Sequence, residues 1–246
     1  MNLKVLYEDN HIIAVCKPAG VLTQGDRTGE ISLYDLVKDY IREKKGKPTL
    51  HKPGNALPLE ARERSGVFLG LVHRLDKPVS GIVLFGKTSK GASRLSEQFR
   101  NHTIQKTYHA IVVGAPKESR GVIKEKVNKI SFFAEGFTNK TDEELLAEIK
   151  KATKTRTAEL SYEVIKSNNK YSLLKILPKT GRFHQIRIQM GNMGCPILGD
   201  EKYSSQRSLP DQSIGLSATA ISFKSATDDK TINLEIPLPE MWKKYI

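Results

Sequence analysis

The chain has 246 residues, a length that one hydrophobic core can still serve, so we expect a single domain over residues 1–246. Charged residues make up 27% of the chain, and no apolar run approaches the roughly 20 residues of a membrane-spanning helix, so we expect no membrane association. Lys and Arg number 40 against 27 acidic residues, and the resulting charge of +13 favours a polyanionic partner, although an inert basic surface would have the same composition.

The amino-terminal residues and the cysteines bear on the compartment and on cofactors. Lys4 lies in a short strand-like stretch that Glu8 ends, which is not the plan of a secretory signal peptide. Cys16 and Cys195 are far apart, and no His/Cys cluster has the spacing of a zinc site. The sequence has no glycine-rich phosphate loop of either nucleotide-binding type. We therefore expect a cytoplasmic protein without a disulfide, a metal or a nucleotide cofactor.

Short runs of β-branched and aromatic residues, bounded by turn-forming residues, predict strands along much of the chain. The first two strands flank Glu8-Asp9-Asn10 and are expected to form a hairpin, and a loop with Pro18 and Gly20 follows. The expected strands are residues 5–7, 12–15, 83–85, 108–113, 158–165, 172–177, 216–223 and 231–236.

Apolar residues recur at helical spacing in a few segments. Ser32 with Asp35 forms a capping box at the start of the first one, and Thr141 with Glu144 does the same for a later one. The expected helices are residues 33–41, 92–99, 143–150 and 184–190, and residues 44–66 are expected to form an exposed basic loop. Many strands, few helices and hairpin-sized connections predict an α+β fold with a largely antiparallel sheet.

The densest cluster of reactive side chains is His73-Arg74-Leu75-Asp76-Lys77, followed by Ser80-Gly81. It places the Asp76 carboxyl between two cations, and a carboxylate flanked by cations stays ionised and can act as a nucleophile. A surface ion pair that caps a turn has the same composition and is the more common case. The local sequence therefore suggests a catalytic acid without deciding for it.

Two further clusters contain residues that could complete a site. In the segment from Lys179 to Arg187, Gly181 permits a sharp entry into a helical stretch, and guanidinium groups such as those of Arg182 and Arg187 suit carboxylate and phosphate. A solvated basic helix is the alternative. In Lys106-Thr107-Tyr108 a tyrosine begins a strand, where its ordinary role is packing with the hydroxyl at the rim.

These clusters, taken in their order along the chain, resemble the RluA-like family of RNA pseudouridine synthases. The resemblance covers nearly the whole chain, and Phe183 stands where relatives usually carry a small hydroxyl residue or another side chain. The segments that carry the resemblance are Glu8-Asp9-Asn10-His11 with Lys17-Pro18-Ala19-Gly20, His73-Arg74-Leu75-Asp76 with Ser80-Gly81, Lys106-Thr107-Tyr108, Thr180-Gly181-Arg182 with His184-Gln185-Ile186-Arg187, and Cys195-Pro196-Ile197-Leu198-Gly199-Asp200 with Tyr203.

The resemblance implies an isomerase that converts selected uridines of a structured ribosomal or transfer RNA into pseudouridine. Asp76 would be the nucleophile, attacking either the ribose or the uracil ring, and Arg187 would pair with it. Tyr108 would pack against the base and take a proton. The reaction is redox neutral and breaks no phosphoester, so neither a metal nor an organic cofactor is expected. The family fold is a mixed, mostly antiparallel central sheet with flanking helices and a central active-site cleft.

The remaining implied residues bind the substrate. Arg74 would enter the gap left when the uridine flips out of its helix, and Leu174 would form an apolar wall under the base. The others implied to bind substrate are His73, Arg182, His184 and Gln185. We expect no S4 RNA-binding module, because the catalytic hairpin begins by residue 5, and we expect a monomer that binds RNA and neither DNA nor a membrane.

Two other interpretations stay open. A non-catalytic RNA-binding protein could keep the same scaffold and use only its positive charge, although it would not need Asp76 in a basic cleft. A metal-dependent nuclease would need clustered carboxylates for Mg²⁺, and the acids near these motifs do not pair in that way.

Overall fold

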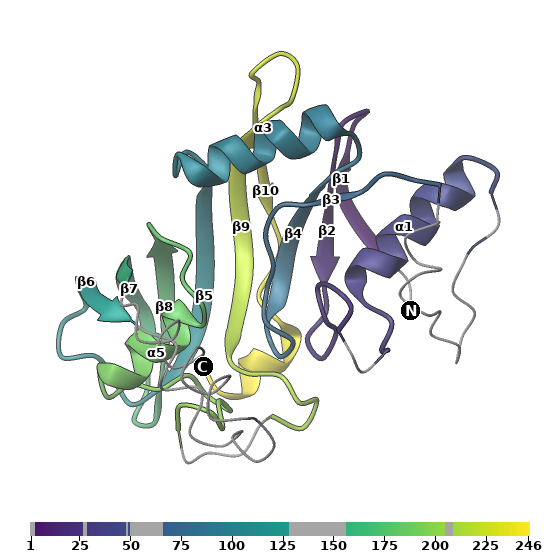
Figure 1. The fold of residues 1–246 in the computed structure, drawn as a ribbon. Helices are drawn as coiled ribbons and strands as arrows, with labels where there is room; N and C mark the ends of the chain where they lie inside the picture. The colour runs from purple at the N-terminus through teal and green to yellow at the C-terminus, as the bar shows by residue number, and fades with distance from the viewer. Residues whose placement is uncertain (1–2, 27–28, 48, 50–65, 128–155, 205–208) are drawn as a thin grey trace, which may run out of the picture.

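The computed structural model describes residues 3–26, 29–47, 49, 66–127, 156–204 and 209–246. Its strands form one sheet with the neighbour order β1-β2-β4-β9-β5-β8-β7-β6, while β10 pairs with β9 and β3 pairs with β4 (Figure 1). The strands are β1 (Lys4–Glu8), β2 (Ile12–Lys17), β3 (Gly70–Leu71), β4 (Ser80–Gly86), β5 (Gln105–Val113), β6 (Arg120–Val127), β7 (Arg156–Ser167), β8 (Tyr171–Pro178), β9 (Leu216–Lys224) and β10 (Thr231–Glu235).

Helices flank this sheet, and a side-chain cap precedes each of the first two. Ser32 accepts a hydrogen bond from the Asp35 amide, and the Asp35 carboxylate accepts one from the Ser32 amide, which completes the capping box. The Thr88 hydroxyl accepts a hydrogen bond from the Gly91 amide at 3.2 Å. The helices are α1 (Leu33–Lys44), α3 (Ser89–Arg100), α5 (Gln185–Asn192) and the 3-10 helix η2 (Glu240–Lys244).

The strands β2 and β4 are buried on both faces. Along β2, Ile13 packs in the cluster that contains Val37 of α1, and its neighbour Ile12 packs in the cluster that contains Leu95 of α3. This alternation follows from the two-residue period of a strand. Each fully buried aliphatic side chain stabilises the fold by about 1.5–3 kcal/mol. Burial on both faces also explains why β4 reads in the sequence as an unbroken apolar run.

The two halves of the sheet meet where β4 runs beside β9. This pairing covers two residue pairs and is parallel, whereas every other strand pair among the described residues is antiparallel. Gly81 has a φ of 134°, and a Cβ at this position would lie 2.4 Å from the Ala218 carbonyl oxygen, so only glycine fits. The prediction of a mixed, mostly antiparallel sheet with few helices is confirmed. The chain segment before β4 leads directly to the place where β4 and β9 pair.

Some elements differ from the sequence-based expectation. β3, β6 and η2 are additional elements, and α5 begins at Gln185 because His184 adopts a left-handed conformation with a φ of 47°. The expected helix at 143–150 and most of the expected loop at 44–66 lie outside the described residues. Within the described parts of the chain, no helix is long and apolar enough to cross a membrane.

Candidate active site

Asp76 lies in the connection between β3 and β4, which hydrogen bonds hold against the loop after β2. The Thr23 hydroxyl donates to the Leu75 carbonyl at 2.7 Å, and the Leu75 amide donates back to the Thr23 hydroxyl at 3.1 Å. On the other side of Asp76, the Gly20 amide donates to the Lys77 carbonyl at 2.8 Å. The backbone is therefore fixed both before and after the carboxylate.

Lys17 is fully buried beneath this junction. Its ammonium group donates to the carbonyl oxygens of Val21 at 2.6 Å, Pro18 at 3.0 Å and Lys77 at 3.1 Å. Burial lowers the pKa of Lys17 to about 7, while the negative charge of Asp76 acts in the opposite direction. One buried cation thus ties the loop after β2 to the residue that follows Asp76.

Arg187 projects from α5 between two carboxylates. Its Nε and Nη2 donate to the two oxygens of Asp200 at 2.7 and 2.8 Å, and its Nη1 donates to Asp76 Oδ2 at 3.1 Å. The Asp200 side chain is 1% exposed and the Asp76 side chain 23%. Burial alone would lower the pKa of the guanidinium, but the hydrogen bonds and charges of Asp200 and Asp76 raise it above its usual value. Arg187 is therefore a fixed cation with one donor aimed at Asp76.

His184 completes this side of the site as a neutral ring. Its Nε2 lies 3.3 Å from Arg187 Nη1 and 3.4 Å from Asp76 Oδ2, and its Nδ1 lies 2.9 Å from the Tyr203 hydroxyl. Burial lowers the pKa of His184 to about 4, against the effect of the Asp76 charge. Because a guanidinium only donates, we assign Nε2 as the acceptor and the proton to Nδ1. The Phe183 ring stacks on this imidazole with centroids 3.8 Å apart.

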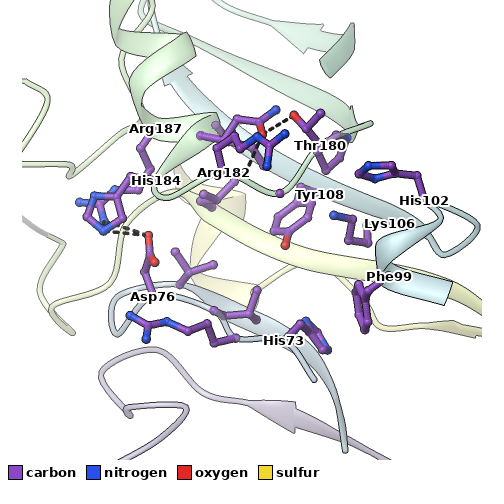
Figure 2. A pocket seen from close by; sticks show the side chains of 18 of the residues that line it. His73, Asp76, Phe99, His102, Lys106, Tyr108, Thr180, Arg182, His184 and Arg187 are labelled. Atoms are coloured by element: carbon purple, nitrogen blue, oxygen red, sulfur yellow. Dashed lines mark hydrogen bonds and ion pairs between the residues drawn. The ribbon is translucent and has the colours of Figure 1, made fainter. Parts of the chain in front are cut away.

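Tyr108 projects into the site from β5. Figure 2 shows its ring between Asp76 on one side and Lys106 on the other. Burial, and to a smaller extent the negative charge of Asp76, raises the pKa of Tyr108 above its usual value, so its hydroxyl stays protonated near neutral pH. The residue offers an aromatic face together with a hydroxyl donor.

His73 lies on the opposite wall, and one of its ring nitrogens is already bonded. Its Nε2 accepts a hydrogen bond from the Leu84 amide at 2.8 Å, and its ring lies against Phe99 with centroids 4.7 Å apart. Burial lowers the pKa of His73 to about 3, so this ring is neutral as well. His73 is therefore held in place as part of the pocket wall, and Nδ1 is the polar atom of its ring that remains available.

Gln185 bonds to the loop before α5. Its Oε1 accepts hydrogen bonds from the Thr180 hydroxyl at 2.6 Å and the Arg182 amide at 3.0 Å, and its Nε2 donates to the Glu159 carbonyl at 3.1 Å. Arg182 Nε donates to the Thr157 carbonyl at 3.1 Å. Gln185 therefore shapes the loop that carries Arg182, and its polar atoms are already occupied.

These side chains surround a pocket of about 540 Å³ (Figure 2). Every site residue expected from the sequence lines it except Leu174, which is fully buried in the core beside β5. The apolar lining comes instead from residues such as Leu216 and Ile186. The expected residues that line the pocket are His73, Arg74, Asp76, Tyr108, Arg182, His184, Gln185 and Arg187.

The cations beside Asp76 in the sequence are not its partners in space. Lys77 forms an ion pair with Glu30 at 2.7 Å, and Arg74 is exposed at the pocket wall. The cation that contacts the carboxylate is Arg187, which follows it by 111 residues. Charge spacing along the sequence therefore indicates a cation near Asp76 but assigns it to the wrong residues.

Three charged residues at the site have no role in the sequence-based interpretation. Asp200 binds Arg187, and Lys17 donates a hydrogen bond to the loop that carries Asp76. Lys106 lines the pocket. Each of them lies in a segment that carries the family resemblance. Their charge and their position inside these segments are the features by which the sequence could have indicated them as site residues.

Comparisons with known proteins identify the family of the chain. A family model described as RNA pseudouridylate synthase matches residues 11–192. The chain is 30% identical to "Ribosomal large subunit pseudouridine synthase C" of Rickettsia bellii, over 98% of this chain and 70% of that protein. It is 29% identical to "tRNA pseudouridine synthase C" of Vibrio cholerae, over 98% of this chain and 93% of that protein. Its fold is similar to the solved structure of Human RNA Pseudouridylate Synthase Domain Containing 4, with a TM-score of 0.70, 22% identity and coverage of 98% and 90%.

The mixed sheet and these matches define the chain as an isomerase that acts on RNA. The chain belongs to the RNA pseudouridylate synthase family. The resemblance that the sequence motifs indicate is confirmed.

Proposed function

We propose that this chain converts selected uridines of ribosomal or transfer RNA into pseudouridine, with Asp76 as the nucleophile and the target uridine flipped into the pocket. The observation that carries the proposal is the Asp76 carboxylate, which is partly exposed in the pocket and held by Arg187 at 3.1 Å. The similar proteins are named for ribosomal large subunit RNA and for transfer RNA, which supports these two substrate classes.

The two oxygens of Asp76 have different surroundings. Oδ2 accepts the hydrogen bond from Arg187 and lies near His184, whereas Oδ1 has no partner among the described residues. A neighbouring guanidinium favours the ionised carboxylate, which is the nucleophilic form. We therefore assign Oδ1 as the attacking atom, on the ribose or on the uracil ring.

The pocket suits a base that has left its helix. Its volume of about 540 Å³ lies in the range of sites that bind small ligands, and a base stacked in a duplex cannot reach a carboxylate at the pocket wall. The Tyr108 ring offers a stacking surface, and such stacking is worth about 1–3 kcal/mol per base. Arg74 is exposed beside Asp76, where a planar cation can fill the gap left in the RNA.

We further propose that residues 1–246 form one catalytic domain that works as a cytoplasmic monomer, with RNA as its partner and neither DNA nor a membrane. All described strands belong to one sheet, which supports a single domain. The charge of +13 supports a polyanionic substrate. The chemistry moves a base from one ribose bond to another without net oxidation, so it requires no metal and no organic cofactor.

The test compares pseudouridine maps of cellular RNA with and without this protein. In cells that lack it, the wild-type protein and Asp229→Asn should restore pseudouridine at particular uridines, and Asp76→Asn should fold and bind RNA but restore none. Asp229 is exposed with a φ of 54°, a conformation that asparagine tolerates, so it is the matched control.

Two outcomes would contradict the proposal. Restoration of pseudouridine by Asp76→Asn would show that the carboxylate is not the nucleophile. Identical maps with and without the protein, together with RNA binding, would favour a non-catalytic RNA-binding protein.

A further inference from the structure

The part of the pocket beyond Tyr108, as seen from Asp76, is built around Lys106. Lys106 and Tyr108 line the pocket from β5, two residues apart, and Figure 2 shows Tyr108 between Asp76 and Lys106. The Lys106 ammonium approaches the loop before α5, where a Cβ at Gly181 would lie 3.6 Å from it. The absence of a side chain at Gly181 leaves space beside this ammonium.

Lys106 is a partly buried cation, and no acid pairs with it among the described residues. Burial lowers the pKa of its side chain. Among the described residues, none accepts a hydrogen bond from its ammonium, and Asp76 is the only acid that lines the pocket. A buried charge without a partner is costly. A substrate atom that carries or gains negative charge at this position would offset that cost.

The orientation of the substrate determines which atom reaches Lys106. With the ribose of the flipped uridine at Asp76, the base extends along Tyr108. Uracil is joined to the ribose through N1, and the carbonyl at C4 lies directly across the ring from N1. O4 therefore points away from Asp76 and toward Lys106.

We propose that Lys106 donates a hydrogen bond to O4 of the flipped uracil and stabilises the negative charge that this oxygen gains in the reaction, an inference that rests on the proposed function. If Asp76 attacks the ribose, the bond between C1′ and N1 breaks, and its electron pair is delocalised through C6 and C5 onto O4. If Asp76 attacks C6, the electrons of the bond between C5 and C6 move toward C4, and O4 becomes an enolate oxygen. Lys106 is thus a catalytic residue on either route.

The hydrogen bond to O4 acts in the first half of the reaction. The base turns before it rejoins the ribose through C5, and C2 then lies across the ring from the new bond. On the ribose route C5 displaces the Asp76 carboxylate from C1′, and on the ring route the carboxylate leaves C6. The proton on C5 is lost, N1 takes up a proton, and the ring regains its double bond between C5 and C6.

The first test measures single-turnover conversion of an RNA stem-loop that contains a uridine mapped in the cellular comparison, at saturating enzyme. Lys106→Met should slow conversion by about 10²- to 10³-fold, which is the effect of removing one donor to a developing oxyanion. Its affinity for the RNA should stay close to that of the wild type, and Lys106→Arg should recover part of the rate. Lys117→Met is the matched control, because Lys117 is exposed beyond the opposite end of β5.

Sulfur substitution in the RNA then identifies the atom, since sulfur accepts hydrogen bonds more weakly than oxygen. The ratio of the wild-type rate to the Lys106→Met rate should shrink when the target is 4-thiouridine and stay at its full value when the target is 2-thiouridine. The ratio is taken within each RNA, so differences in the intrinsic reactivity of the thio bases cancel.

Several outcomes would overturn the inference. Conversion by Lys106→Met at the wild-type rate is one, and equal ratios on the two thio RNAs are another. Lys106→Met could instead bind RNA more weakly, with an unchanged rate at saturating enzyme and a slope of log affinity against log salt concentration that is smaller by about 0.7. That result would show that Lys106 contacts a phosphate. If Lys106→Met fails to fold, Lys106→Gln carries the same comparisons. Absence of pseudouridine with the wild-type protein would contradict the proposed function itself.

Discussion

Replacing Asp200 with asparagine should release Arg187 from its buried anchor without changing the size of the side chain. The Asp200 carboxylate accepts two hydrogen bonds from the guanidinium, at 2.7 and 2.8 Å. An amide has one acceptor and one donor, so one guanidinium N–H would face another N–H. We expect the guanidinium to turn away from Asp200 and to lose its orientation toward Asp76.

The structure sets the size of this effect. Removing one partner of a buried ion pair typically costs about 3–5 kcal/mol. Asp76 lies 3.1 Å from the same guanidinium and still balances its charge, so we expect the lower value, about 3 kcal/mol in the free energy of unfolding. In a protein of this size that corresponds to a fall of about 6–12 °C in melting temperature. Loss of one oriented donor should slow the chemical step by about 10²-fold.

Thermal melting followed by circular dichroism measures the first effect, and single-turnover conversion of the mapped RNA measures the second. Asp229→Asn makes the same chemical change at an exposed position and should alter neither quantity. The reasoning is refuted if Asp200→Asn melts at the wild-type temperature and converts RNA at the wild-type rate. Lower stability with an unchanged rate would show that Asp200 supports the fold without positioning Arg187.

Three further predictions concern Lys17, Tyr108 and the basic surface. Burial lowers the pKa of Lys17 from 10.5 to about 7, so between these two pH values the unfolded chain binds more protons than the folded chain. The free energy of unfolding of the wild type should therefore rise with pH in this range relative to that of Lys17→Met. Parallel pH profiles of the two proteins in urea titrations would contradict this. Tyr108→Phe should slow conversion by about 10²- to 10⁴-fold if the hydroxyl transfers a proton, and Tyr108→Leu should be slower still because it also loses the stacking surface. A Phe variant at the wild-type rate would limit Tyr108 to positioning the base. RNA affinity should fall steeply between about 50 and 200 mM salt, and an affinity independent of salt would argue against contacts to phosphate.

Elements with a complete local signal were predictable from the sequence. The capping box at Ser32 and the apolar run of β4 depend only on neighbouring residues. β6 carries no such signal, because it lies at the edge of the sheet and its exposed residues include Val122 as well as charged side chains. β3 has two residues and is a strand only because β4 lies beside it. Tertiary context, which no local pattern contains, defines these two strands.

The site was predictable through family motifs and not through local chemistry. Asp76 and Arg187 are 111 residues apart, and no spacing rule brings them together. Local charge indicated Lys77 as a partner of Asp76, but its flexible side chain reaches Glu30 instead. Leu174 has the apolar character expected of a pocket wall, but its strand directs it into the core, and a sequence cannot show which apolar residues border a cavity.

Two buried ionisable groups fix the candidate site, and each has its hydrogen-bond partners only when distant segments meet. Lys17 needs carbonyl groups from the loop after β2 and from the Asp76 loop, and Asp200 needs the guanidinium of Arg187. A charge removed from water costs several kcal/mol unless its partners are in place, so displacing either segment penalises folding as well as catalysis. Apolar contacts alone would not link the position of these segments to the stability of the fold in this way, because they are not directional and tolerate repacking. Variants at Lys17 and Asp200 should therefore lose stability and rate together, whereas variants at Tyr108 and Lys106, which face the pocket, should lose rate with little loss of stability.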